Sequence, residues 1–179
     1  MKSDFEILEI VKQTIKKESE SIKKLLDYVD NEFVSAIKEI FNSKGRVIIS
    51  GIGKSAIIGN KIVATLNSTG TPAIFMHAAE AIHGDLGIIQ PDDVVICISK
   101  SGNTPEIKVL TPLVKSRGNK LIALVGNTDS YLAKSADYVL NCTVEKEACP
   151  NNLAPTSSTT AQLVLGDALA VALLYCKNF

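Results

Sequence analysis

Apolar residues recur at helical spacing along the first 41 residues of the chain. Between Asp4 and Phe41 they return every three or four positions, with lysines and glutamates in the intervening places. This pattern predicts amphipathic helices, either one long helix or two shorter ones divided near Asp30 and Asn31. We expect the charged residues to face solvent, and the apolar stripe to belong to the core or to a subunit interface.

Beyond residue 45, short apolar runs alternate with helical segments. The alternation favours a parallel sheet with helices on both faces and right-handed connections. The last helix is expected to start in the hydroxyl-rich stretch 156–160 and to run to about Tyr175. The strands are predicted at residues 47–50, 72–76, 94–98, 120–125 and, as an edge strand, 138–140.

The most informative turn follows the apolar run at 94–98. Residues 99–104 (SKSGNT) are rich in hydroxyls, and Thr104, Pro105 and Glu106 supply the N-cap, first-turn proline and first-turn acid of a helix. The free N–H groups and positive dipole end of that helix, beside three hydroxyls and a lysine, are suited to hold a phosphate. A plain N-cap cluster is the alternative, because helix starts favour Ser and Thr in any protein.

A second predicted strand passes into a helix through the glycines of residues 51–56 (GIGKSA). A P-loop needs a glycine five residues before the GKS triplet, but Ile48 occupies that position. The spacing does match the GxGxxA dinucleotide fingerprint. That motif also needs an acidic residue about 20 positions later, and the next predicted strand ends at His77 instead. Nucleotide binding is therefore disfavoured.

Composition narrows the classes of partner. The 179 residues fit one domain, and 46% hydrophobic content is enough for a sizeable core. Nineteen acidic residues balance nineteen basic ones, so the chain lacks the basic field that attracts nucleic acid or an anionic membrane.

We found no run of about 18 apolar residues and no signal peptide, and the four cysteines form no C-x-x-C pair. These features predict a cytoplasmic protein with reduced thiols.

The two histidines do not predict a metal site by themselves. His77 and His83 are six residues apart, too far for the i, i+4 spacing that places two ligands on one helix face. Each is expected to be a structural or surface histidine on this evidence. The polar loop 146–155, which contains two prolines, is of the kind retained for function.

From Arg46 to Leu174 the chain resembles the SIS (sugar isomerase) domain family, and more narrowly the catalytic domains of arabinose-5-phosphate isomerases. The resemblance implies one SIS domain over residues 1–179, with an N-terminal helical arm (1–43) and a core (44–179). The core is expected to be an α/β, three-layer αβα sandwich around a mainly parallel five-stranded sheet. Six segments in the same order carry the resemblance: GIGKS (51–55), STGTP (68–72), HAAEAIHGDLG (77–87), SKSGNT (99–104), KEACP (146–150) and LAPTSSTT (153–160).

The resemblance implies an aldose–ketose isomerase that interconverts D-ribulose 5-phosphate and D-arabinose 5-phosphate through an enediol(ate). Its product would supply Kdo and lipopolysaccharide biosynthesis. The alternative is a non-catalytic SIS domain that binds or senses a phosphosugar. The isomerase route requires no cofactor, and relatives assemble as homotetramers with sites between subunits. Many relatives continue into a Ser-His-Pro-Gly-Gly segment and two CBS domains, and the sequence ends at Phe179 before both. We therefore expect a catalytic-domain fragment or a short form.

The resemblance also implies roles for individual residues. The phosphate is expected at Ser55, Ser99, Ser101 and Thr104, and the catalytic positions at Lys54, Glu106 and Glu147. The sugar is expected to contact Gly70, Thr71 and His83, while His77 matches a position that binds inhibitory zinc in relatives.

The reaction needs a base of near-neutral pKa, an acid–base group for ring opening, and a group that stabilises an enediolate oxygen. Glu147, in the polar loop, is predicted to be the base. Glu106 is the second choice, because the helix dipole at its position lowers the pKa of a carboxyl group.

Overall fold

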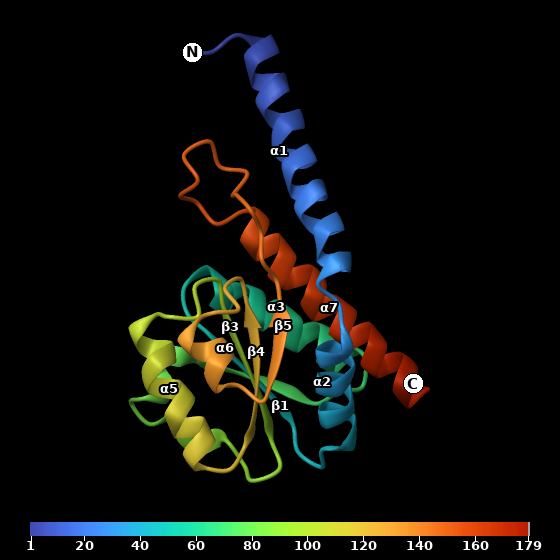
Figure 1. Cartoon of the computed structure of the whole chain (residues 1–179), viewed down its shortest axis with the longest axis vertical. Coiled ribbons are helices and arrows are strands. Elements are labelled where there is room, and N and C mark those ends of the chain that lie inside the picture. Colours follow the sequence, from blue (N-terminus) through green and yellow to red (C-terminus); the bar gives the residue numbers. More distant parts are fainter. Residues whose placement is uncertain (179) are drawn as a thin grey trace.

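The computed structural model describes residues 1–178, which form a five-stranded sheet covered by helices on both faces (Figure 1). All four strand pairings are parallel, and the strand order is β2-β1-β3-β4-β5. The predicted α/β sandwich is confirmed, with a fully parallel sheet in place of a mainly parallel one. The strands are β1 (Val47–Gly51), β2 (Ala73–His77), β3 (Val94–Ser99), β4 (Lys120–Val125) and β5 (Tyr138–Asn141).

Alternate side chains of the strands enter two separate cores, because successive residues of a strand point to opposite faces. Ile49 and Ile96 belong to one core, and Ile48 and Val95 to the other. The first core is covered by α2 (Asn31–Asn42), α3 (Lys54–Ser68) and α7 (Ser157–Lys177). The second is covered by α4 (Ala78–Ala81), α5 (Pro105–Ser116) and α6 (Tyr131–Ser135), with η2 (Asp85–Ile88) beside them.

The N-terminal helix α1 (Asp4–Lys24) extends away from the sandwich (Figure 1). Ser3 begins it with a capping box, and a short 3₁₀ turn, η1 (Leu25–Asp27), ends it. The predicted division near Asp30 is confirmed, since the Asp30 side chain accepts the Glu32 N–H and caps α2. No residue of α1 itself is buried, so the outer part of its apolar stripe is not core within one subunit.

Helix α7 is long and apolar enough to cross a membrane by length and composition alone. Asp167 and the polar residues at the start of the helix interrupt its apolar sequence. In the fold, α7 packs against α3, α1 and α2. Gly166 permits the close approach to α3, since a β-carbon there would lie 2.3 Å from the Ile62 side chain.

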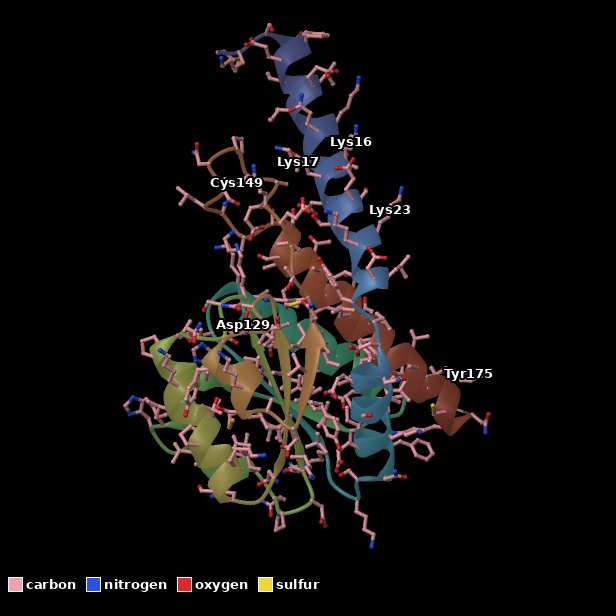
Figure 2. The ribbon with its side chains drawn as sticks, in the orientation of Figure 1. Lys16, Lys17, Lys23, Asp129, Cys149 and Tyr175 are labelled. Atoms are coloured by element: carbon pink, nitrogen blue, oxygen red, sulfur yellow. The ribbon has the colours of Figure 1, made fainter. Side chains whose placement is uncertain are left out.

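The cysteines agree with the prediction of reduced thiols. Cys97 and Cys142 are buried, Cys176 is exposed, and Cys149 lies in the loop after β5 that projects beside α1 (Figure 2). All four are unpaired within the described residues 1–178. Burial raises the pKa of both Cys97 and Cys142 to about 12, so these two thiols behave as small apolar side chains.

Candidate active site

The carboxyl ends of β1 and β3 lie side by side, because Gly51 pairs with Ile98 in the parallel register. The turns that follow these strands, together with the start of α7, enclose a cavity of about 330 Å³. Pockets at the carboxyl edge of a parallel sheet are the usual ligand sites of α/β folds. The cavity is lined by Ile52, Lys54, Ser55, Ile98, Ser99, Lys100, Ser101, Thr104, Pro155, Ser158, Thr159 and Gln162.

The β3–α5 turn is held in shape by its own hydroxyls. The Ser99 Oγ accepts the Gly102 N–H at 3.0 Å, and the Ser101 Oγ accepts the Asn103 N–H at 3.2 Å. Gly102 has a φ of 63°, and a β-carbon at this position would lie 2.1 Å from the Ser130 Oγ. A glycine is therefore required for α6 to pack against this turn.

Thr104 places a buried hydroxyl at the wall of the cavity. It is the N-cap of α5, yet its side chain makes no capping bond, and its buried Oγ1 has no hydrogen-bond partner among residues 1–178. Buried hydroxyls are normally paired, so an unpaired one next to a cavity indicates that a ligand atom belongs there. Its position at the start of α5, where backbone N–H groups are free, favours an anion.

The β1–α3 turn brings the other predicted phosphate ligand and a positive charge to the same cavity. Lys54 is exposed at the first position of α3. The Ser55 Oγ donates to Gln162 Oε1 on α7 at 3.2 Å. The structure therefore gathers Lys54, Ser55, Ser99, Ser101 and Thr104 around one cavity, as predicted from two segments more than 40 residues apart in the sequence.

Glu147, the predicted base, is buried beside the cavity. Its side chain is 0% exposed, and its carboxylate caps the start of α7. One oxygen accepts from Lys100 Nζ at 2.6 Å and Ser158 Oγ at 2.5 Å. The other accepts from the Thr156 N–H at 2.8 Å, the Ser158 N–H at 3.1 Å and the Thr156 Oγ1 at 3.2 Å.

These contacts set the ionisation of Glu147. Burial opposes its negative charge, but the hydrogen bonds from Lys100, from the Ser158 hydroxyl and from two backbone N–H groups outweigh burial and lower its pKa to about 2. A pKa of about 2 is far below the near-neutral value that the reaction needs from its base. Lys100 was counted from sequence only as a nearby charge and Ser158 as part of an N-cap cluster, although both line the cavity.

Other predicted residues lie outside this cavity. Glu106 is half-buried in the first turn of α5. Gly70 and Thr71 precede β2 and so lie at the amino end of the sheet, whereas the cavity lies at its carboxyl end. There Lys177 Nζ donates to the Gly70 carbonyl at 3.0 Å and to the Thr71 Oγ1 at 2.9 Å. One subunit alone does not bring Gly70 and Thr71 to the phosphate turn.

His77 is the last residue of β2, at the carboxyl edge of the sheet, and His83 follows it after α4. His77 Nδ1 accepts the Ala79 N–H at 3.3 Å and caps α4, while His83 is exposed. Within residues 1–178, no cluster of three or more His, Cys, Asp or Glu side chains could hold a metal ion. The zinc position at His77 stays a prediction.

Comparison with known proteins places this architecture in a family. The SIS domain model matches residues 39–172, and the chain belongs to the SIS domain family. It is 50% identical, over all 179 residues, to a Pseudomonas aeruginosa protein named arabinose 5-phosphate isomerase KdsD. That match covers 55% of the Pseudomonas protein, so the chain spans about half the length of the curated relatives it matches.

Solved structures of similar length share the fold. The structure of E. coli CFT073 c3406 in complex with arabinose 5-phosphate is 41% identical, with a TM-score of 0.95, and the match covers 99% of this chain and 95% of that one. A Listeria monocytogenes structure that is 34% identical has a TM-score of 0.96, and the match covers 100% of this chain and 94% of the other. The three-layer arrangement is therefore that of solved SIS proteins.

Proposed function

We propose that this chain is an aldose–ketose isomerase that interconverts D-ribulose 5-phosphate and D-arabinose 5-phosphate and supplies Kdo biosynthesis. The observation that carries the proposal is the unpaired, buried Thr104 hydroxyl at the start of α5, in a cavity that also contains Lys54 and Lys100. Such a site is suited to a phosphate. The name of the Pseudomonas relative and the sugar phosphate bound to the E. coli protein support the choice of sugar.

The proposed reaction moves one proton between adjacent carbons. A carboxylate takes the proton, the C–H electron pair forms the enediol double bond, and the carbonyl oxygen takes the negative charge. The proton of the neighbouring hydroxyl then moves to that oxygen, so that this hydroxyl becomes the new carbonyl, while the same carboxylate returns the carbon-bound proton to the former carbonyl carbon. No external oxidant or reductant is needed. We assign the proton transfer to Glu147, stabilisation of the enediolate oxygen to Lys54, and orientation of Lys54 or of substrate hydroxyls to Glu106.

A direct assay tests the activity. We expect the purified chain to convert D-arabinose 5-phosphate to D-ribulose 5-phosphate without added metal, in a coupled or NMR assay. Binding of arabinose 5-phosphate without turnover, even when the chain is joined to a relative's C-terminal half, would favour the alternative of a non-catalytic phosphosugar-binding domain. That alternative needs the phosphate turn but not Glu147.

The phosphate turn can be tested separately. Replacing Ser101 and Thr104 with alanine removes two hydroxyl hydrogen bonds to a charged group, each worth about 1.5–3 kcal/mol. The KM should therefore rise at least about tenfold, while the circular dichroism spectrum stays unchanged. Ser116→Ala on the exposed end of α5 is the matched control. An unchanged KM in the double variant would place the phosphate elsewhere.

We further propose a cytoplasmic homotetramer in which α1 packs against another copy of the chain. The stripe of exposed apolar residues on α1 supports this, because water-exposed apolar surface of this extent favours association. His83 is exposed and outside the cavity, so its proposed contact with the sugar would come from a neighbouring subunit. Sedimentation velocity measures the assembly. The stripe consists of Phe5, Ile7, Leu8, Ile10, Val11 and Ile15.

A further inference from the structure

Glu147 is separated from the cavity by two residues that contact both. Its carboxylate is inaccessible to solvent and is absent from the cavity wall, whereas Lys100 and Ser158 line that wall and donate to the same Glu147 oxygen. A ligand in the cavity can therefore influence Glu147 only through these side chains or after one of them moves. A base in this position needs such a movement before it can reach substrate.

Lys100 is the more mobile of the two contacts. Its side chain is 48% exposed, and its ammonium group is a compact charge on a flexible stem. It belongs to the β3–α5 turn, between Ser99 and Ser101, where the phosphate is proposed to bind. In the described part of the chain it is the one charged side chain in salt-bridge contact with Glu147.

A phosphate monoester competes directly for this ammonium group. It carries about −1.5 to −2 charges at neutral pH and three acceptor oxygens, against one negative charge on Glu147. The remaining donors to Glu147, namely the Thr156 and Ser158 groups, come from the start of α7 and do not depend on Lys100. The carboxylate would therefore keep its place when Lys100 leaves.

We propose that Lys100 is a positioning residue that couples phosphate binding to the base: a bound phosphate draws its ammonium group into the cavity and leaves Glu147 without a counter-ion. This inference rests on the proposed role of Glu147 as the proton-transferring residue. It makes Glu147 an inert ion-pair partner in the free protein and a base only when substrate is present.

The ionisation of Glu147 agrees with this coupling. Burial is the largest influence on its pKa and acts upward, while the hydrogen bond from Lys100 is the first of those that act downward. Removing the ammonium group should therefore raise the pKa of a buried carboxyl group. Lys54 faces the cavity from α3, and Glu106 lies in the first turn of α5. Neither Lys54 nor Glu106 is changed in the variants compared below.

The test follows the carboxyl carbon signal of Glu147 by NMR, assigned by its loss in Glu147→Gln. The probe is inorganic sulfate, a tetrahedral anion that is doubly charged at neutral and mildly acidic pH. In the wild-type chain, saturating sulfate should raise the pKa of Glu147 by at least about one unit. In Lys100→Met the pKa should already be raised without sulfate, and sulfate should change it less.

Lys108→Met is the matched control, because Lys108 is an exposed lysine on α5; it should respond like the wild-type chain. Sulfate that shifts the Gly102 and Thr104 amide signals but leaves the pKa of Glu147 unchanged would overturn the coupling. Failure of sulfate to shift those amides would overturn it too, since the turn would not bind the anion.

Kinetics separate this inference from the proposed function. Lys100→Met should raise KM about tenfold or more, because one charged hydrogen bond to the phosphate is lost. Lys100→Arg should bring KM much of the way back to the wild-type value. The acid side of the pH profile of kcat reports ionisation in the enzyme–substrate complex. Its midpoint should be the same in Lys100→Met as in the wild-type chain. A shifted midpoint would mean that Lys100 stays paired with Glu147 in the complex. A sulfate-linked pKa change without any isomerisation would preserve the coupling and reject the activity.

Discussion

Replacing Glu147 with glutamine is expected to lower kcat by roughly 10²-fold or more, the usual contribution of a general base. Glutamine keeps the size of the side chain and one oxygen for the N–H groups of Thr156 and Ser158, but it has no basic oxygen. The KM should stay the same or fall, because Lys100 then has no carboxylate partner and is free for the phosphate. Steady-state assays with both sugar phosphates give both constants.

Glu106→Gln is the matched comparison, since it removes the same charge from the first turn of α5. As an orienting group, Glu106 should affect kcat and KM by smaller factors. Exchange of solvent deuterium into the substrate carbon reports proton abstraction even where product release is slow. Exchange that is lost in Glu106→Gln and retained in Glu147→Gln would reverse the assignment of the base.

Replacing Asp93 with alanine is expected to lower the free energy of unfolding by about 3 kcal/mol, the lower end of the losses found when one partner of a buried ion pair is removed, because the remaining Arg46 side chain is partly exposed. Asp93 is 2% exposed. It accepts from the Arg46 backbone N–H at 2.7 Å, from Arg46 Nη2 at 2.9 Å and from the Gln90 N–H at 2.8 Å. These bonds join the starts of β1 and β3. Urea unfolding measures the change.

The same variant should flatten the acid side of the stability profile. Burial disfavours the charge of Asp93, but hydrogen bonds from Arg46 and Gln90 outweigh it, and the pKa of Asp93 lies below its ordinary value. A lowered folded-state pKa gives stability that is complete above the unfolded pKa, about 3.9, and is lost as the pH falls towards the folded value. Below about pH 4, the free energy of unfolding of Asp93→Ala should therefore fall less steeply with decreasing pH than that of the wild-type chain.

Asp92→Ala is the control, because Asp92 is exposed and only its backbone carbonyl accepts a hydrogen bond, from Ser43 Oγ. Its effect on stability should stay within about 0.5 kcal/mol, as for other surface substitutions. Equal losses in the two variants would show that the Arg46–Asp93 contact does not hold the two strands together.

Local sequence patterns were sufficient for the architecture. Each strand was predicted to within one residue of its observed ends, because a buried parallel strand needs a short, continuous apolar run. The helix start at Thr104-Pro105 was equally clear, since capping and the fixed φ of proline act over a few residues. The phosphate turn could be predicted for the same reason: its hydroxyls and the α5 N-terminus are adjacent in the chain.

Burial and pairing of individual side chains could not be predicted in this way. Lys100 and Glu147 are 47 residues apart. No local pattern shows that the start of α7 buries the Glu147 carboxylate beside Lys100. The sequence by itself determined the order of elements, the parallel sheet and the turn suited to a phosphate. Only the tertiary structure decided that Glu147 is buried and ion-paired and that Gly70 and Thr71 lie at the other end of the sheet. A side chain's solvation and charge partners depend on elements that only folding brings together.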